Sequence, residues 1–253
     1  MNNPKQNKPH LTQDLLLGGK VILWQSIDGY RAGIDAVLLA TSTKPKTNQK
    51  ILDLGCGAGA VSLCVLANYP DVFVTGLEIM EETVDVAKLN AKENNVEVNF
   101  CPILGSIADM PSKIKKNSFD LVLSNPPFAA SGTSNFSSNI RKKIAHAETG
   151  TNIEMWIKVA AAALKHKGII SLIHRADRLD HLLCALRPYF GEIIIHPLWP
   201  KSGRKANRIL IKATKGSKSP TVLTAGTIIH TDSGSYTPEI ESVLRGRSLL
   251  TME

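Results

Sequence analysis

Several features are missing from this sequence, and each absence excludes a class of protein. The chain has no apolar run of the roughly eighteen residues that a membrane-spanning helix requires. Its first ten residues are polar and lack the apolar core of a secretory signal. Its four cysteines show none of the paired spacings of metal ligands, so we expect no metal site and interpret them as reduced, buried thiols: Cys56, Cys64, Cys101 and Cys184. The sequence therefore predicts a cytoplasmic protein.

What is present is enough apolar material for a core, together with an excess of positive charge. Of the 253 residues, 43% are hydrophobic, which is sufficient for one sizeable domain core. The formal net charge is +8 and the sequence pI is about 9.3. Such a charge favours a polyanionic partner, although solvated lysines alone can also produce it.

One stretch organises the rest of the chain: Ile51-Leu-Asp-Leu-Gly-Cys-Gly-Ala-Gly59. Apolar residues and Asp53 lead into glycines at positions 55, 57 and 59, and a helix-compatible run follows directly. This pattern predicts a buried parallel strand, a tight turn and a helix start whose free N–H groups can bind a polar ligand. Glu78 ends the next apolar run, where an acid can accept both hydroxyls of a ribose.

Strand and helix patterns alternate from residue 51 onward, which predicts a mostly parallel sheet with helices on both faces. We expect strands at 51–54, 72–77, 97–101, 119–124, 169–174, 192–197 and 207–213, the last two forming an antiparallel pair at one edge. Helices are expected at 59–68, 81–94, 152–166, 177–187 and 239–245.

The N-terminal part is predicted to add smaller elements to this sheet. An arm at 1–18 should become ordered near Leu11, a hairpin should join 21–24 to 25–27, and Asp35 should cap a helix at 36–41. The polar loop at 129–150 is longer than a loop that only connects two secondary-structure elements, so we expect it to cover a site.

A second motif, Ser124-Asn-Pro-Pro-Phe128, follows the fourth predicted strand. Ligands of open α/β sheets bind beyond the carboxyl ends of the strands, so Asn125 should face the same crevice as the glycine turn. The Asn125 side-chain oxygen and the Pro126 carbonyl could accept two hydrogen bonds from one planar NH₂ group. Phe128 could stack on the base that carries this group. Such an arrangement suits methylation of an amino nitrogen, with catalysis by orientation and electrostatics.

Taken together, these residues resemble a known family. Asp53-Leu-Gly-Cys-Gly-Ala-Gly59 with Asn125-Pro-Pro-Phe128 is similar to class I S-adenosylmethionine-dependent methyltransferases that act on amino nitrogens. From about Leu16 to Leu244 the chain resembles the bacterial tRNA1(Val) adenine-37 N6-methyltransferase group. That longer likeness includes Tyr30-Arg-Ala-Gly-Ile-Asp35-Ala-Val-Leu-Leu, Pro197-Leu-Trp-Pro-Lys and Tyr236-Thr-Pro-Glu.

The resemblance implies a Rossmann-like, seven-stranded methyltransferase sheet, S-adenosylmethionine as cofactor, and tRNA as partner. It implies an N-terminal arm and capping segment at 1–46, a methyltransferase domain at 47–215 and a C-terminal tail at 216–253 packed on or near that domain.

Roles follow residue by residue from the same resemblance. Asp53 and the glycines at 55, 57 and 59 would hold the cofactor's methionine end, and Glu78 its ribose, with Ile79 against the adenine. Asn125, Pro126, Pro127 and Phe128 would hold the target amine, Asn125 also touching the cofactor. Arg31 and Asp35 match a segment that closes over the cofactor. Relatives carry an acid where this chain has Ser106, so either Ser106 or Asp109 would have to contact the adenine.

Basic residues gather in three groups: Arg141, Lys142 and Lys143; Lys201, Arg204, Lys205 and Arg208; and Lys212, Lys215 and Lys218. The first group lies beside the amine pocket and favours RNA, whereas the last is interpreted as a solvated surface.

Other functions compete with adenine methylation. The same chemistry could act on a guanine N2 in rRNA or on a protein glutamine, although glutamine enzymes usually carry Tyr where this chain has Phe128. A non-catalytic RNA-binding module is a further alternative. A nicotinamide dehydrogenase is disfavoured because no residue supplies a hydride-side acid.

Overall fold

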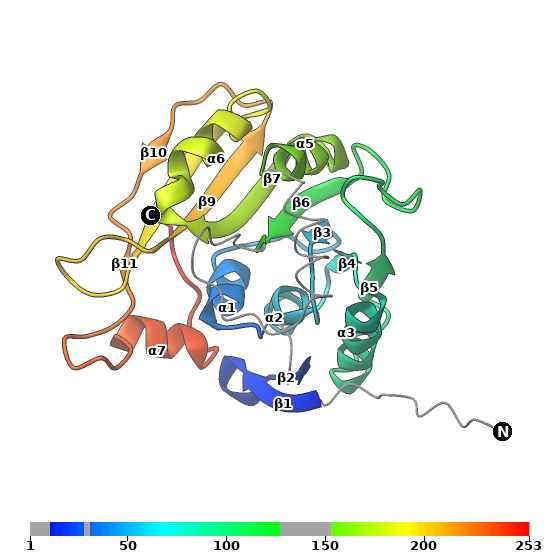
Figure 1. Ribbon diagram of the computed structural model, residues 1–253, viewed down its shortest axis with the longest axis horizontal. Coiled ribbons are helices and arrows are strands. Elements are labelled where there is room, and N and C mark those ends of the chain that lie inside the picture. Colours follow the sequence, from blue (N-terminus) through cyan, green and yellow to red (C-terminus); the bar gives the residue numbers. More distant parts are fainter. Residues whose placement is uncertain (1–10, 28–30, 127–152, 253) are drawn as a thin grey trace.

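The computed structural model describes residues 11–27, 31–126 and 153–252. A central sheet separates two layers of helices, with α1, α2 and α7 on one face and α5 and α6 on the other (Figure 1). This is the mixed α/β, Rossmann-like fold that the alternating pattern predicts, so the predicted fold class is confirmed.

The sheet has nine strands in the order β10-β8-β9-β7-β6-β3-β4-β5, with β11 pairing beside β8. The bounds of the long strands are β3 Lys50–Leu54, β4 Phe73–Glu78, β5 Phe100–Leu104, β6 Phe119–Ser124, β7 Leu164–Arg175, β8 Phe190–Trp199 and β9 Arg208–Lys215. Two residues each form β10 (Val222–Leu223) and β11 (Thr227–Ile228), and these account for the difference from the seven predicted strands.

The predicted antiparallel pair is present, because β9 runs against both β7 and β8. Both β10 and β11 lie parallel to β8 and extend this side of the sheet. Strand β5 begins three residues later than the predicted 97–101, at Phe100, and β7 extends well beyond the predicted 169–174.

The helices follow from their composition and their ends. Their bounds are α1 Ile34–Thr41, α2 Ala60–Asn68, α3 Glu81–Glu93, α5 Ile153–Ala163, α6 Leu179–Leu186 and α7 Pro238–Leu244, with short 3₁₀ turns η1 Leu17–Gly19 and η2 Ala176–Arg178. Helix α2 is apolar along nearly its whole length and is buried against the sheet. Helix α7 begins with a proline after Thr237, whose hydroxyl accepts a hydrogen bond from the Ile240 N–H at 3.4 Å.

Two expectations about the N-terminal part are wrong. Residues 21–26 form one strand, β2 (Val21–Ser26), whose antiparallel partner is β1 (Leu11–Leu16). The predicted turn inside 21–27 does not form, because the alternating pattern continues through Trp24 and buries every second side chain of β2. Helix α1 starts one residue before Asp35 with Gly33 as its N-cap, so Asp35 does not cap it.

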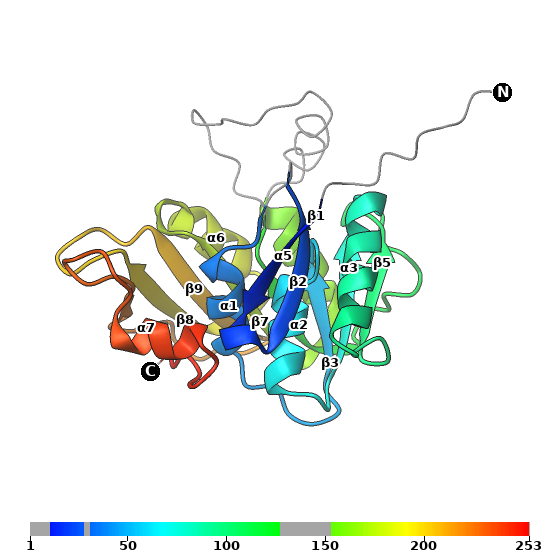
Figure 2. The ribbon, with the colours of Figure 1, turned by 90° about the horizontal axis from the view of Figure 1, so that it is seen from below.

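The β1–β2 hairpin forms a separate two-stranded sheet that lies outside α1 and α2, on the side away from the large sheet (Figures 1 and 2). It contacts α2 and α3, and η1 contacts α7, so the two ends of the described chain meet on one face. Among the described residues, no helix combines the length and the apolar character needed to cross a membrane.

Candidate active site at the carboxyl ends of three strands

Three adjacent strands end together and bring the predicted site residues to one edge. Leu54, the last residue of β3, is paired with Leu77 on one side and with Ser124 on the other. Since the strands are parallel, the residues that follow them, at 55, 78 and 125, share the carboxyl edge of the sheet. The structure therefore brings the glycine loop, Glu78 and Asn125 together.

The three loop glycines all adopt left-handed conformations, with φ of 72° at Gly55, 55° at Gly57 and 90° at Gly59. Their surroundings differ. A Cβ on Gly55 would lie 2.7 Å from the Trp156 ring, and one on Gly59 would lie 2.7 Å from the Phe100 ring. A Cβ on Gly57 would meet no described atom within 4 Å. Gly55 and Gly59 thus let the loop pack tightly, whereas Gly57 borders open space that a ligand could fill.

Glu78 is tied to the same loop. Its Oε2 accepts a hydrogen bond from the Gly57 N–H at 3.0 Å, and its Oε1 accepts one from the Met80 N–H at 2.9 Å. Burial raises the pKa of the carboxyl, and these backbone donors oppose the rise. The side chain is held at the crevice with lone pairs left for further donors.

Asp53 lies behind the loop, fully buried at 1% exposure. Its Oδ2 accepts a hydrogen bond from the Ser62 hydroxyl at 2.7 Å. Burial raises the pKa of Asp53 to about 6, although the Ser62 hydrogen bond lowers it. Burial and the two nearby carboxyls raise the pKa of the Cys56 thiol well above its usual value, which makes that thiol an unreactive packing group.

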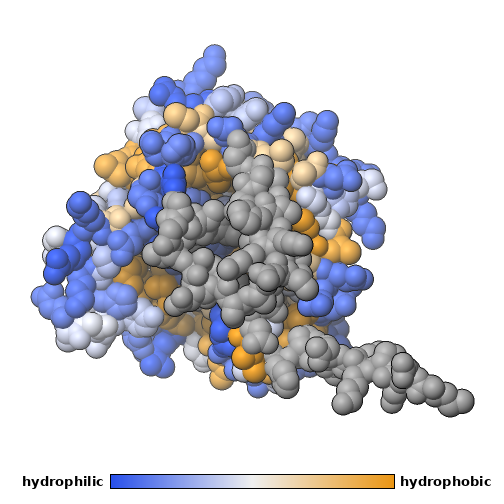
Figure 3. Space-filling model, viewed as in Figure 1, coloured by the Kyte–Doolittle hydropathy of each residue, from blue (hydrophilic) through white to orange (hydrophobic). Residues whose placement is uncertain are grey.

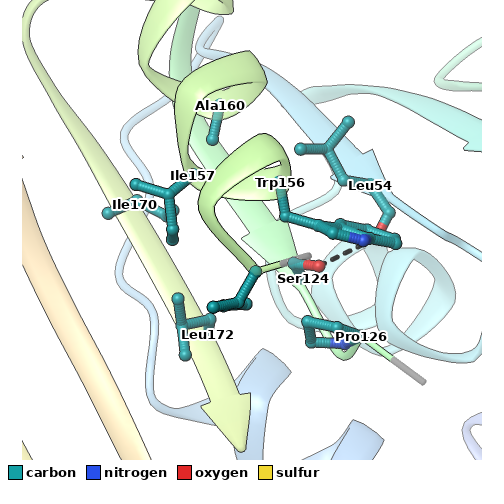
Figure 4. A pocket seen from close by; sticks show the side chains of 9 residues that line it. Leu54, Ser124, Pro126, Trp156, Ile157, Ala160, Ile170 and Leu172 are labelled. Atoms are coloured by element: carbon teal, nitrogen blue, oxygen red, sulfur yellow. Dashed lines mark hydrogen bonds between the residues drawn. The ribbon is translucent and has the colours of Figure 1, made fainter. Parts of the chain in front are cut away.

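Asn125 follows β6 and is positioned by its neighbours. The Ser124 hydroxyl donates to the Leu54 carbonyl at 3.0 Å and fastens the end of β6 to the end of β3 (Figure 4). The Asn125 Oδ1 atom is buried and has no hydrogen-bond partner among the residues that the structure describes. A buried acceptor without a donor is costly, so it marks a place where a ligand's N–H or O–H group would be bound.

A small apolar pocket lies behind this turn, between α5 and the sheet. Pro126, Trp156 and Leu172 line it together with Leu54 and Ile157 (Figure 4). Ser124 also lines it, but its hydroxyl is already bonded to the Leu54 carbonyl. The walls of the pocket support the turn, and the Trp156 ring reaches from here to Gly55.

The β1–β2 hairpin is docked beside the glycine loop by two asparagines of α3. The Asn90 Oδ1 accepts from the Trp24 N–H at 2.7 Å, and its Nδ2 donates to the carbonyls of Trp24 and Ala58, each at 2.9 Å. Asn94 makes the equivalent pair of bonds with Ile22, at 2.9 and 2.7 Å. Asn90 therefore joins the hairpin directly to the loop that carries the three glycines.

Arg31 and Asp35 are held by protein partners. Arg31 binds Thr12 and Asp14 of β1, which ties the segment before α1 to the hairpin. The Asp35 Oδ2 accepts from the Arg208 Nε at 3.0 Å, linking α1 to β9. Their predicted contacts with a cofactor stay predictions.

The remaining predicted cofactor residues lie near the same edge. Ile79 is half-buried and follows Glu78 directly. The Ser106 hydroxyl accepts from the Ala108 N–H at 3.1 Å, and Asp109 is exposed. The contact of either residue with an adenine stays a prediction.

Part of the predicted site falls outside the described residues: Pro127, Phe128, the loop at 129–150 and the basic residues Arg141, Lys142 and Lys143. The basic residues after β8 are described and lie at the carboxyl end of the sheet. Arg204 and Lys205 are exposed there. The left edge of the face shown in Figure 3 is mainly hydrophilic. In the part of the chain that the structure describes, no cluster of three metal-ligating side chains occurs.

Sequence reasoning assigned no positioning role to several residues, namely Ser62, Asn90, Ser124, Trp156 and Arg208. The Trp156 ring lies against Gly55, although the two residues are 101 positions apart. Such contacts leave no signal in local periodicity. The sequence does show that Asn90 and Asn94 are four positions apart, a spacing that places two side chains on the same face of a helix.

Comparison with known proteins agrees with this geometry. The protein-family model of the methyltransferase small domain matches residues 31–193 of this chain. The tRNA1(Val) (adenine(37)-N6)-methyltransferase of Porphyromonas gingivalis is 29% identical over 83% of this chain and 85% of its own length. The release factor glutamine methyltransferase of Streptococcus pneumoniae is 33% identical, but the match spans only 37% of this chain and 32% of that relative.

A solved structure shares most of the architecture. A predicted O-methyltransferase from Agrobacterium tumefaciens superimposes with a TM-score of 0.72 at 25% identity, covering 86% of this chain and 98% of the other. The family match covers more than half of the chain and includes the glycine loop, Glu78 and Asn125. The chain therefore belongs to the methyltransferase small domain family and is a methyltransferase.

Proposed function

We propose that the protein methylates the N6 amino group of an adenine in tRNA, in the cytoplasm, with S-adenosylmethionine as the methyl donor. One observation carries this proposal: the buried Asn125 Oδ1 lacks a partner among the described residues and lies at the strand edge that carries the glycine loop. An acceptor in that position calls for a donor such as an amine N–H.

The residues present fit the proposed cofactor. Glu78 is a fixed acceptor for the two hydroxyls of a ribose, since backbone N–H groups already orient its carboxylate. The open space at Gly57 lets a ligand approach the backbone closely. Buried Asp53 supports the loop from behind through Ser62.

The chemistry requires little from the protein beyond orientation. S-adenosylmethionine supplies an electrophilic methyl group, which the adenine nitrogen takes up as the carbon–sulfur bond breaks. Asn125 Oδ1 and the Pro126 carbonyl would each accept a hydrogen bond from one of the two N6 N–H groups and so favour a nitrogen lone pair directed away from them. The methylated nitrogen then loses a proton to water, and no strong base is needed. Orientation and preorganised acceptors of this kind supply most of such a rate enhancement.

The extent of the similarities favours tRNA over the alternatives. The relative named as a tRNA methyltransferase matches 83% of this chain, whereas the release factor relative matches only 37%. The similarity to the tRNA enzyme therefore extends over much more of the chain than the similarity to the release factor enzyme does. The exposed Arg204 and Lys205 at the carboxyl edge add phosphate-binding groups near the site.

A direct test measures transfer of labelled methyl groups from S-adenosylmethionine to total tRNA from a strain lacking the gene. We expect N6-methyladenosine to appear with the wild-type protein and not with Asn125→Ala, as read by mass spectrometry of the nucleosides. Equal transfer by the two proteins would refute the role of Asn125.

The same assay separates the other amino substrates. Cell extract from the deletion strain is treated with nuclease or with protease before labelling. Loss of acceptor activity after nuclease supports an RNA substrate, and loss only after protease would replace the proposal with a glutamine substrate. Recovery of N2-methylguanosine would replace it with a guanine.

A further inference from the structure

The opposite end of the sheet, where the parallel strands begin, carries a dense group of lysines. The loop before β6, the start of β7 and the end of β9 with the turn after it all reach this end, because β9 runs against β7. We define the amino-end lysine face by six residues from these segments: Lys115, Lys116, Lys165, Lys167, Lys215 and Lys218. All are exposed except Lys215, which is half-buried.

Contacts between the backbones show that these segments converge. The N–H groups of Asn117 and Ser118 donate to the carbonyls of Ala162 and Ala163, each at 2.9 Å. Lys215 spans the same junction, since its Nζ donates to Asn117 Oδ1 at 2.9 Å and to the Leu164 carbonyl at 2.6 Å. Residues separated by about 100 positions in sequence thus form one surface.

Few acids oppose this charge. Among the described residues of 113–120, 164–168, 190–192 and 214–218, the acidic side chains are Asp120 and Glu192. Asp120 offsets one of the six charges, because it pairs with Lys165, and its other oxygen accepts from the Lys50 N–H. The face therefore presents a strong positive field, which attracts a polyanion.

Lys167 adds an argument from backbone conformation. It adopts φ of 63° in the turn that opens β7, a region that glycine and asparagine occupy at lower cost. Its side chain is exposed. Since the backbone conformation does not favour a lysine at this position, we attribute the residue to its charge.

We propose that the amino-end lysine face binds the phosphate backbone of the RNA substrate at a point remote from the target base. This inference rests on the proposed RNA substrate, and it assigns a second contact to that substrate. The two ends of β6 are separated by the length of a six-residue strand, about 20 Å. A folded RNA whose loop binds at the carboxyl edge of the sheet can reach the amino-end lysine face with another part of the molecule. A short stem-loop RNA cannot bind at both places at once.

The test removes charge without disturbing the fold. Lys115→Gln/Lys116→Gln removes two exposed charges, and Lys88→Gln/Lys92→Gln on α3 is a matched control with two exposed lysines. Lys167→Asn is a third variant that relieves backbone strain, so its melting temperature should equal or exceed that of the wild type. Binding of total tRNA is measured by fluorescence anisotropy between about 50 and 200 mM KCl, where phosphate contacts dominate.

We expect Lys115→Gln/Lys116→Gln to weaken tRNA binding roughly tenfold and to lower the salt-dependence slope by about 1 to 2, one unit for each lost phosphate contact. Lys167→Asn should weaken binding about threefold, and the control should match the wild type. The inference is overturned if the face variants bind like the control, or if all variants weaken equally.

Kinetics then show whether the contact is remote from the chemistry. With full-length tRNA the face variants should raise KM and leave kcat unchanged, and with a short stem-loop RNA they should behave like the wild type. An equal effect on both RNAs would place the lysines near the site and contradict the inference. Salt-dependent binding that needs these lysines, without any methyl transfer, would support the face and refute the proposed function.

Discussion

The two ends of the central sheet handle charge in opposite ways. At the carboxyl end, Asp53 and Glu78 are withdrawn from water, and burial raises the pKa of both. At the amino end, lysines are left in solvent, and the half-buried Asp120 is fully paired. In the proposed function, the buried carboxyl groups at the carboxyl end orient a small ligand. The solvated lysines at the amino end attract a large polyanion.

This difference predicts how each end responds to substitution. Polar groups at the carboxyl end are coupled to backbone geometry, so changes there should alter catalysis, cofactor affinity or folding by large factors. Changes at the amino end should alter only RNA affinity. The substitutions below test this difference between the two ends, in order of decreasing expected effect.

Asn125→Ala should lower kcat by about 100-fold or more, since the proposed mechanism assigns to this side chain the acceptor for the reacting amine. The melting temperature should not fall, because the removed oxygen has no partner among the described residues. Steady-state methylation and thermal unfolding check the two parts. A matched Asn125→Asp variant keeps acceptor oxygens and should retain more activity than alanine; a reversed order would contradict the assigned role.

The loop glycines should separate packing from ligand binding. Gly59→Ala should lower the free energy of unfolding by about 2 to 3 kcal/mol, because it adds an overlap with Phe100 to a strained φ. Gly57→Ala has no such overlap, so it should fold and lose at least about tenfold in affinity for S-adenosylmethionine. Urea unfolding and calorimetry measure these effects. Intact cofactor binding by Gly57→Ala would show that the open space is not used.

Asp53 should leave a signature in the pH dependence of stability. Burial raises the pKa of Asp53 to about 6 in the folded chain, whereas the pKa of an exposed aspartate is 3.8. Between those values the folded state binds more protons, so the free energy of unfolding falls as pH rises, by up to about 3 kcal/mol from this group.

The comparison with Asp53→Asn isolates that contribution. Urea unfolding from pH 4 to pH 7 should show the wild type losing stability relative to the variant until about pH 6, with a constant difference above it. A difference that is flat across this range would show that Asp53 titrates normally.

Asn90→Ala should loosen the hairpin and the glycine loop together. It removes bonds to Trp24 and to Ala58, which leaves buried backbone groups unpaired and costs about 2 kcal/mol. We expect KM for the cofactor to rise about fivefold. Asn94→Ala is the control, because it releases Ile22 without touching the loop. If both variants raise KM equally, the Ala58 contact is irrelevant to the site.

The region that sequence analysis predicts best is the unit from β3 to β4. Glycine spacing, the acid before it and the acid after the next strand are local signals, and each reflects a backbone conformation or a strand end. The same holds for Asn125, whose position beyond β6 follows from the rule that parallel strands deliver their next residues to one edge.

Contacts between distant residues are what the sequence could not predict. Asp35 looked like a helix cap because it precedes an apolar run, yet the structure pairs it with Arg208, 173 positions away. Residues 21–27 looked like a hairpin because the partner strand, β1, has three consecutive polar residues, Thr12, Gln13 and Asp14, and so resembled an arm. The basic residues at 212–218 were interpreted as a solvated surface. The local sequence does not show that residues 115–116 and 165–167 fold beside them.

The hairpin's attachment has a consequence for the order of events at the site. Its two strands pair with each other, and in the described residues they share no ladder with the nine-stranded sheet. Val21 and Leu23 of β2 are nevertheless buried in the core that α1 and α2 share, so lifting the hairpin would expose apolar surface as well as break side-chain bonds. Opening of the hairpin is therefore costly, and we expect ligand exchange at the glycine loop to proceed with the hairpin docked.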